Sequence, residues 1–150
     1  MKTRKRIHPS TEKGQSLVEL AISLTFILIL LAGVVYFGIG LFYYIAMRDA
    51  AQEGALYGSM NPDDAAEIES RVANAAGDGL IQTLYDAGEL DVTIAYSGAH
   101  CEGNGITITV AHDYSLNWLP IGSFISPFIG SDIIQLRAVV TDTILTPACP

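Results

Sequence analysis

The feature that most constrains this chain is a run of residues without a charged side chain, from residue 20 to residue 47. About 20 apolar residues cross the hydrocarbon core of a bilayer, which is about 30 Å thick. As a helix the run would be roughly 42 Å long, so it would have to tilt or protrude. A buried core helix is the alternative, but a core helix needs no such length. The sequence therefore predicts one membrane-spanning helix.

Charge is distributed unevenly on either side of this run. The net charge is −8, yet residues 1–14 hold five basic side chains and one acid, and residues 15–150 hold three basic and fifteen acidic ones. Basic flanks stay in the cytoplasm, so we expect a single-pass protein with its N-terminus inside and residues 48–150 outside. A cleaved signal peptide fits less well, because its apolar region is about 7–15 residues long. The same topology signal explains the basic residues without nucleic-acid binding.

The junction before the run reads Lys13-Gly14-Gln15-Ser16-Leu17-Val18-Glu19-Leu20. It resembles the junction of type IV prepilins, in which a basic leader ends in Gly and a Glu stands fifth in the mature chain. The segment GQSLVELA, followed later by the segment AAQEGALYG, is most similar to TadE-like pseudopilins of tight-adherence pilus systems. The resemblance covers residues 13 to 60. The chain departs from the family's usual residues by Lys13 in place of Arg and Leu20 in place of Phe, and by the segment Gln52-Glu53-Gly54-Ala55-Leu56.

The resemblance implies a processing and assembly role for three residues. A membrane prepilin peptidase would cut between Gly14 and Gln15, and the new amine would pair with Glu19 of a neighbouring subunit during filament assembly. Gly14 offers the extended backbone that a protease needs. Glu19 lies in the first turn of the mature helix, where the dipole favours a negative charge. The alternative is a Glu that lies at the membrane edge without a partner.

The helix is predicted to continue beyond the apolar run, through residues 48–60. Small residues recur every four positions at Ala46, Ala50, Gly54 and Gly58. Such a stripe allows close approach of another element. It is either a face for packing subunits together or the seat of this chain's own head.

The remaining residues predict a small α+β head. Asn61 and Pro62 are expected to cap and begin a second helix that runs to about Tyr85, with a possible break at Gly77 and Gly79. Three half-buried strands follow, marked by alternation over residues 90–96, 106–111 and 134–140. We expect them to form an antiparallel sheet on the emergent helix, with the first two joined as a hairpin.

Two further features of the head leave alternatives open. If the second and third strands are antiparallel neighbours, Cys101 and Cys149 arrive at the same end of the sheet, which predicts a disulfide rather than two free thiols. The apolar connection 116–130 either covers the sheet as core or is an exposed surface for a partner.

The sequence predicts no catalytic site, cofactor or metal. His100, Cys101, Glu102, His112 and Asp113 have no metal-ligand spacing, and no nucleophile or phosphate-binding motif occurs. We expect a basic leader (1–14), a transmembrane and emergent helix (15–60) and an extracytoplasmic head (61–150). The predicted protein is a structural pilin-like subunit of an adhesive filament at the cell surface. Its partners would be the prepilin peptidase, other pilin subunits, the inner-membrane assembly machinery and the membrane. An uncleaved membrane-anchored binding module is the alternative, and an exported enzyme is a more distant one.

Overall fold

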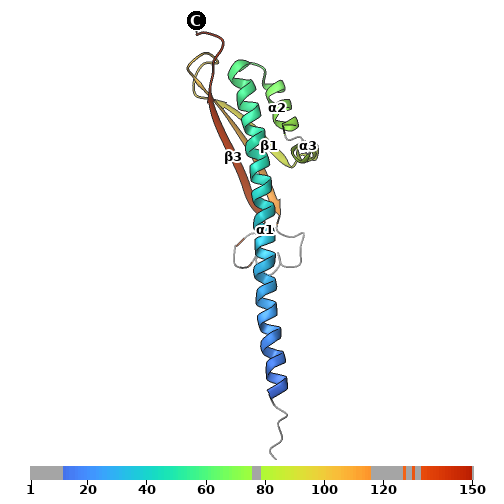
Figure 1. Ribbon diagram of the computed structural model, residues 1–150. Coiled ribbons are helices and arrows are strands. Elements are labelled where there is room, and N and C mark those ends of the chain that lie inside the picture. The colour runs from blue at the N-terminus through green and yellow to red at the C-terminus, as the bar shows by residue number, and fades with distance from the viewer. Residues whose placement is uncertain (1–11, 76–78, 116–126, 128–129, 131–132, 150) are drawn as a thin grey trace, which may run out of the picture. The chain divides into compact units, whose positions relative to one another are not determined.

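The computed structural model describes residues 12–75, 79–115, 127, 130 and 133–149. Its elements in chain order are α1 (Glu12–Met60), α2 (Ala65–Asn74), α3 (Leu80–Asp86), β1 (Leu90–Tyr96), β2 (Gly105–Ser115) and β3 (Ile133–Thr143) (Figure 1). A long apolar N-terminal helix, two further helices and a three-stranded antiparallel sheet confirm the predicted α+β class. The chain divides into two compact units, Met1–Tyr36 and Phe37–Pro150.

Helix α1 is continuous through Gly33, Gly38 and Gly40, and no proline lies within its sequence. It ends at Met60 because the next residue, Asn61, precedes Pro62, and the residue before a proline is driven out of the helical region. The Asn61 N–H still donates to the Tyr57 carbonyl at 3.0 Å, which closes the last turn. The prediction that the helix continues past residue 47 to residue 60 is confirmed.

The predicted second helix is two helices. Asp64, not Asn61, is the N-cap of α2, since its side chain accepts from the Glu67 N–H at 3.2 Å. Pro62 therefore lies in a turn and is not the first helical residue, which corrects that prediction. Gly79 adopts a left-handed conformation (φ 72°) immediately before α3, a conformation that glycine adopts without steric cost. The predicted interruption of the helix is thus present.

The sheet has the strand order β1-β2-β3, and both pairs are antiparallel. Ile108 in the central strand pairs with Ile94 on one side and with Val140 on the other. Alternate residues of β2 are buried, from Ile106 to Tyr114, as the period of two requires. The predicted strands and hairpin are all present, and β2 and β3 are longer than the sequence pattern indicated.

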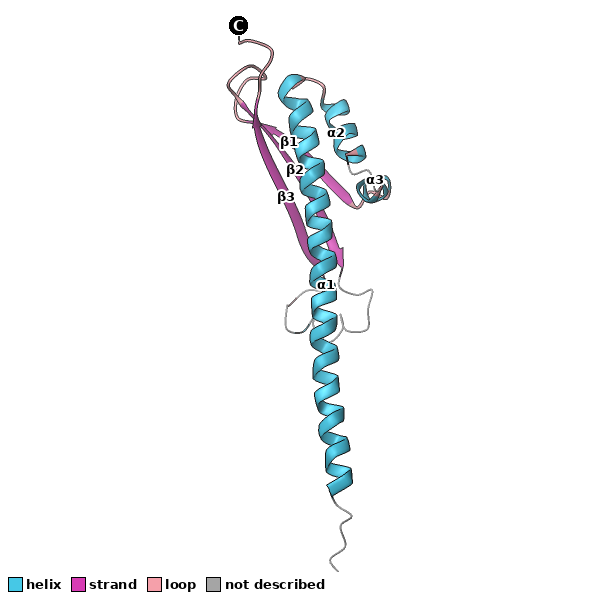
Figure 2. Cartoon of the chain, viewed as in Figure 1, coloured by secondary structure: helices cyan, strands magenta, loops and turns pink. Residues whose placement is uncertain are grey.

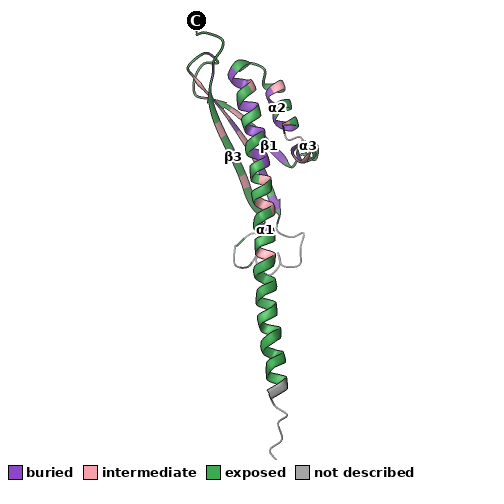
Figure 3. Ribbon diagram, viewed as in Figure 1, coloured by how far each residue is buried: buried purple, intermediate pink, exposed green. Residues whose placement is uncertain are grey.

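One face of the sheet is covered by the C-terminal part of α1, with α2 beside it (Figure 2). The core between these elements includes Met47, Ala50, Ile68, Val72 and Ile108, all fully buried. Figure 3 shows buried positions along this part of α1 and along the inner face of the strands. The apolar connection 116–130, for which core packing and partner binding were both expected, lies outside the described residues except for positions 127 and 130.

Candidate functional site: the α1 junction and packing face

The predicted processing junction lies in the first turns of α1. Gly14, Gln15 and Glu19 are all helical and exposed, and a Cβ added to Gly14 would meet nothing within 4 Å. The extended backbone expected at Gly14 is therefore not the conformation of the uncleaved chain. The first N–H groups of a helix have no intrahelical acceptors, so its first turn opens at little cost. Cleavage after Gly14 would require only this local opening.

Glu19 has no salt-bridge partner among the residues that the structure describes. Its neighbours Leu17, Val18 and Leu20 are each more than half exposed. This apolar surface continues along the helix, and Gly14–Met60 is long and apolar enough to cross a membrane. Only 6% of its most apolar window is buried, whereas a core helix of a soluble protein would be mostly buried. The carboxylate thus stands at the start of an apolar helical segment that is mostly exposed among the described residues.

The stripe of small residues faces this chain's own head. Ala46 and Ala50 are buried. A Cβ added to Gly54 would overlap Val72 Cγ2 of α2 and lie 3.7 Å from Ile68 Cγ2. At Gly58 it would overlap Ile106 Cδ1 of β2 and lie 3.2 Å from Ile68 Cδ1. The two glycines therefore bring α1 into close contact with α2 and the sheet.

One charged group of α2, the Arg71 guanidinium, contacts α1 and is held by an ion pair within α2. The Arg71 guanidinium lies over the Tyr57 ring, 5.1 Å from its centroid, and its Nε donates to Glu67 Oε1 at 3.0 Å. A cation–π contact at an exposed site contributes about 0.5–1 kcal/mol, and an exposed i,i+4 ion pair contributes about 0.3–0.5 kcal/mol. Packing of Ile68 and Val72 against the glycine stripe therefore stabilises this contact more than the charged groups do.

Residues 144–149 form a C-terminal strap that lies against the C-terminal end of α1. The Leu145 N–H donates to the Ser59 carbonyl at 2.8 Å, and Thr146 Oγ1 donates to the Met60 carbonyl at 2.7 Å. The last carbonyls of a helix have no intrahelical donors, so these two bonds cap α1. Sequence reasoning missed this cap, because no local pattern joins residues 86 positions apart.

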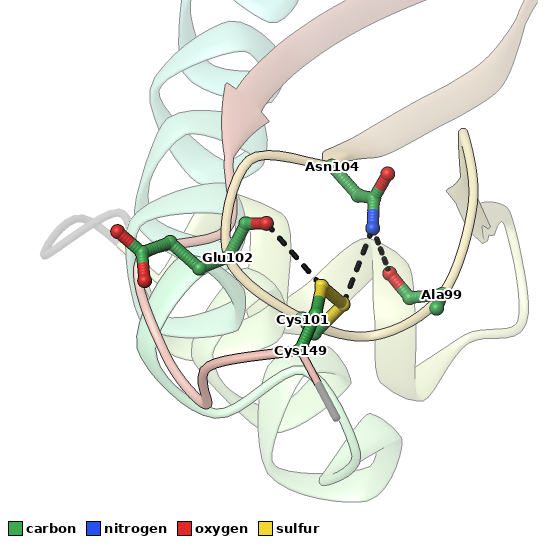
Figure 4. The surroundings of a disulfide bond; sticks show 5 residues. All are labelled: Ala99, Cys101, Glu102, Asn104 and Cys149. Carbon is green, nitrogen blue, oxygen red and sulfur yellow. Dashed lines mark hydrogen bonds between the residues drawn. A yellow bond between two sulfur atoms is a disulfide. The ribbon is translucent and has the colours of Figure 1, made fainter.

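The predicted disulfide between Cys101 and Cys149 is confirmed and ties the strap to the β1–β2 loop (Figure 4). Figure 4 shows Asn104 beside it: Nδ2 donates to the Ala99 carbonyl at 2.9 Å and to Cys101 Sγ at 3.4 Å. Backbone bonds from Gly103 to Ile144 and from Glu102 to Pro147 run alongside. The disulfide therefore closes the loop against the strap that caps α1.

The same loop also contacts the turn between α1 and α2. Tyr96 donates its phenolic O–H to the Pro62 carbonyl at 2.5 Å, and His100 Nδ1 lies 2.7 Å from Asp63 Oδ1. The Tyr96 and His100 rings lie 3.7 Å apart between centroids. Partial burial, followed by the nearby Asp63 charge, raises the pKa of the Tyr96 phenol above its ordinary value. Tyr96 and His100 therefore hold this end of the head to the turn that follows α1.

The candidate metal ligands have other partners. His100 contacts Asp63, Cys101 is in the disulfide, and His112 Nδ1 donates to the Glu89 carbonyl at 2.9 Å. The His112 ring also stacks on Tyr43 of α1, 5.5 Å between centroids. Across the part of the chain that the structure describes, no group of three or more His, Cys, Asp or Glu side chains is placed to hold a metal ion. These residues join β2 and its loop to the helices.

An apolar N-terminal helix of membrane-spanning length, with an α+β head on its C-terminal part, fits the pilin-like class that the junction resembles. Residues 14–56 match the family model described as TadE-like protein, so the TadE-like character predicted from the sequence is confirmed over this segment. The match includes Gly14, Gln15, Glu19 and Gly54 and ends before Gly58, α2 and the sheet. No curated protein and no solved structure matched the chain.

Proposed function

We propose that this chain is a structural pilin-like subunit of a tight-adherence pilus, a filament of the type IV class. The observation that carries the proposal is that the TadE-like match, residues 14–56, includes the apolar and mostly exposed first half of α1. A helix of this kind requires lipid or other apolar helices around it, because exposing its many leucine, isoleucine and phenylalanine side chains to water is unfavourable. The protein would therefore act by packing and not by catalysis.

In this proposal the chain inserts with its N-terminus in the cytoplasm and residues 61–150 outside. A prepilin peptidase removes residues 1–14, and the assembly machinery of the inner membrane then transfers the mature chain, residues 15–150, into a surface filament that serves adhesion. Residues 15–60 make the contacts with other pilin subunits. Since the head already covers the small-residue stripe, the apolar surface before Tyr36 and the exposed side of α1 remain for those neighbours.

Glu19 would be paired with the Gln15 amine of a neighbouring subunit. A carboxylate near the middle of a bilayer costs about 2.5–3.5 kcal/mol on insertion scales, so an opposite charge from a neighbour would favour docking. Glu19 has no such partner in the described part of its own chain, which leaves it available. This pairing would set the position of each subunit's N-terminus relative to its neighbour in the filament.

The processing step is tested by Gly14→Leu, with Gly33→Leu as the matched control. A Cβ at either position meets nothing within 4 Å, so neither change should disturb the fold. We expect Gly14→Leu to accumulate as full-length precursor on immunoblots and Gly33→Leu to be processed. Product of mature size from Gly14→Leu would contradict cleavage at this site.

The assembly step is tested by Glu19→Ala and by the isosteric Glu19→Gln. Both should insert and be processed normally, and both should be depleted from the sheared-surface fraction. Loss in the alanine variant alone would indicate a packing role for the side chain. Normal incorporation of both variants would overturn the charge pairing and would favour the uncleaved or unassembled membrane-anchored binding module.

A further inference from the structure

We propose that Gln15 is a modification site: once it becomes the N-terminus, the unassembled chain closes it to pyroglutamate. This inference rests on the proposed cleavage after Gly14. In the reaction the neutral α-amine of Gln15 attacks the Cδ carbonyl carbon of the same side chain. A new N–Cδ bond forms, the bond from Cδ to the side-chain nitrogen breaks, and that nitrogen leaves as ammonia with the amine proton. The product is a five-membered lactam, and no oxidant or further reactant is needed.

The position of Gln15 leaves both reacting groups free. Its side chain is exposed, and within the described residues it has no hydrogen bond that would hold the amide away from the amine. Gly14, which is removed, also has open space around it. After cleavage Gln15 would be the first residue of α1, where the backbone nitrogen has no intrahelical acceptor. The amine can therefore turn toward its own side chain without breaking a helical bond.

The product is compatible with the helix that follows. The lactam joins the backbone nitrogen to Cδ of the first residue, which has no preceding residue and therefore no φ to restrict. That nitrogen stands at the first position of the helix, where it has no intrahelical acceptor to lose. Cyclisation should therefore leave α1 and the head unchanged, and its effect should be confined to charge.

Loss of the amine charge would oppose assembly through Glu19. An α-amine has an ordinary pKa of about 7.7–8.0, so on the order of a tenth of it is neutral and reactive near pH 7. Pairing with a carboxylate favours the charged form, which is not a nucleophile. Chains already paired with Glu19 of a neighbour would thus be protected, whereas waiting chains would lose the charge permanently. Cyclisation and assembly compete for the same amine.

The test is the intact mass of the full mature chain, extracted cold from membranes of its native host after new synthesis is stopped, and followed with time. The matched control is Gln15→Ala, which keeps the α-amine but has no side-chain amide for it to attack. We expect wild-type chains in the membrane fraction to lose one molecule of ammonia with time. The Gln15→Ala chains should keep their mass, and wild-type chains in the sheared-surface fraction should be depleted of the product.

The outcomes separate this inference from the proposed function. Chains that begin at Gln15 and lose no ammonia with time, whether the amine is free or methylated, would overturn cyclisation and leave processing intact. Ammonia loss to the same extent in Gln15→Ala would place the reaction elsewhere and also overturn it. Chains that begin at Met1 would overturn both proposals, because no N-terminal Gln15 would exist.

Discussion

Substitution of Gly54 by alanine tests whether the glycine stripe seats α2 in the head. The added methyl group would overlap Val72 Cγ2, and Val72 is fully buried in α2. Valine has one strongly preferred rotamer in a helix, so it cannot turn away cheaply. Overpacking costs about 1–3 kcal/mol, from which about 1 kcal/mol is recovered because alanine favours the helix more than glycine does. We expect a net loss of roughly 0–2 kcal/mol, in the upper part of that range.

Two further variants make the explanation specific. Gly58→Ala has a similar overlap, but with Ile106 Cδ1, the end of a side chain that can rotate about χ2, so it should cost less. Val72→Ala alone should cost up to about 1.5–3 kcal/mol, the value of burying a valine. In the double variant Gly54→Ala/Val72→Ala the new methyl group occupies part of the space that Val72 leaves. The double variant should therefore lose less free energy of unfolding than the sum of the two single losses. The difference, which is the coupling energy between the two positions, should be about 0.5–3 kcal/mol.

The assay is thermal unfolding of the detergent-solubilised chain, followed by near-ultraviolet circular dichroism of the head's tyrosines. At this chain length about 1 kcal/mol corresponds to a shift of about 2–4 °C in Tm. The reasoning would be refuted if Gly54→Ala were as stable as the wild type and if its effect simply added to that of Val72→Ala. That result would mean that α1 and α2 are not in close contact at Gly54.

Three other variants test the far end of the head by the same unfolding assay. Replacing Cys101 and Cys149 by serine should cost roughly 4 kcal/mol in the chain-entropy model, and reductant should then have no further effect; equal stability would contradict the role of the disulfide. Asp64→Ala should cost about 1 kcal/mol as a lost N-cap and Asp64→Asn much less, whereas equal losses would refute capping. The pKa of the Tyr96 phenol is higher in the folded chain than its unfolded value of 10.0, so the protonated phenol stabilises the fold. This contribution to the free energy of unfolding is fully present below pH 10.0 and is lost as the pH rises through the pKa of the folded chain. Stability should thus fall more steeply above pH 10 in the wild type than in Tyr96→Phe, and parallel curves would contradict this.

Much of the fold could be predicted because it depends on local patterns. The uncharged run and the small-residue stripe indicated α1, and the alternation around Ile94, Ile108 and Ala138 indicated the strands in their chain order. The α2 cap was assigned wrongly because Asn61 and Asp64 are both good N-cap residues, and only the turn around Pro62 decides between them. Local sequence alone therefore does not distinguish Asn61 from Asp64 as the N-cap of α2.

The contacts that could not be predicted join residues far apart in the chain. The cap of α1 by Leu145 and Thr146 and the pairing of His100 with Asp63 depend on how the strap and the β1–β2 loop fold back. The helical conformation of Gly14 was also missed, because glycine's flexibility suggested an extended junction. The candidate site could be proposed from the sequence because Gly14, Gln15, Glu19 and the small-residue stripe all belong to one helix.

The central claim is that the chain is processed after Gly14 and built into a filament, and the first residue of the chain in each cell fraction tests it most directly. Intact mass should be measured for the chain from membranes and from sheared surface material of its native host. We expect chains that begin at Gln15 in both fractions. Chains that begin at Met1 and occur only in membranes would contradict the claim and would favour a membrane-anchored binding module.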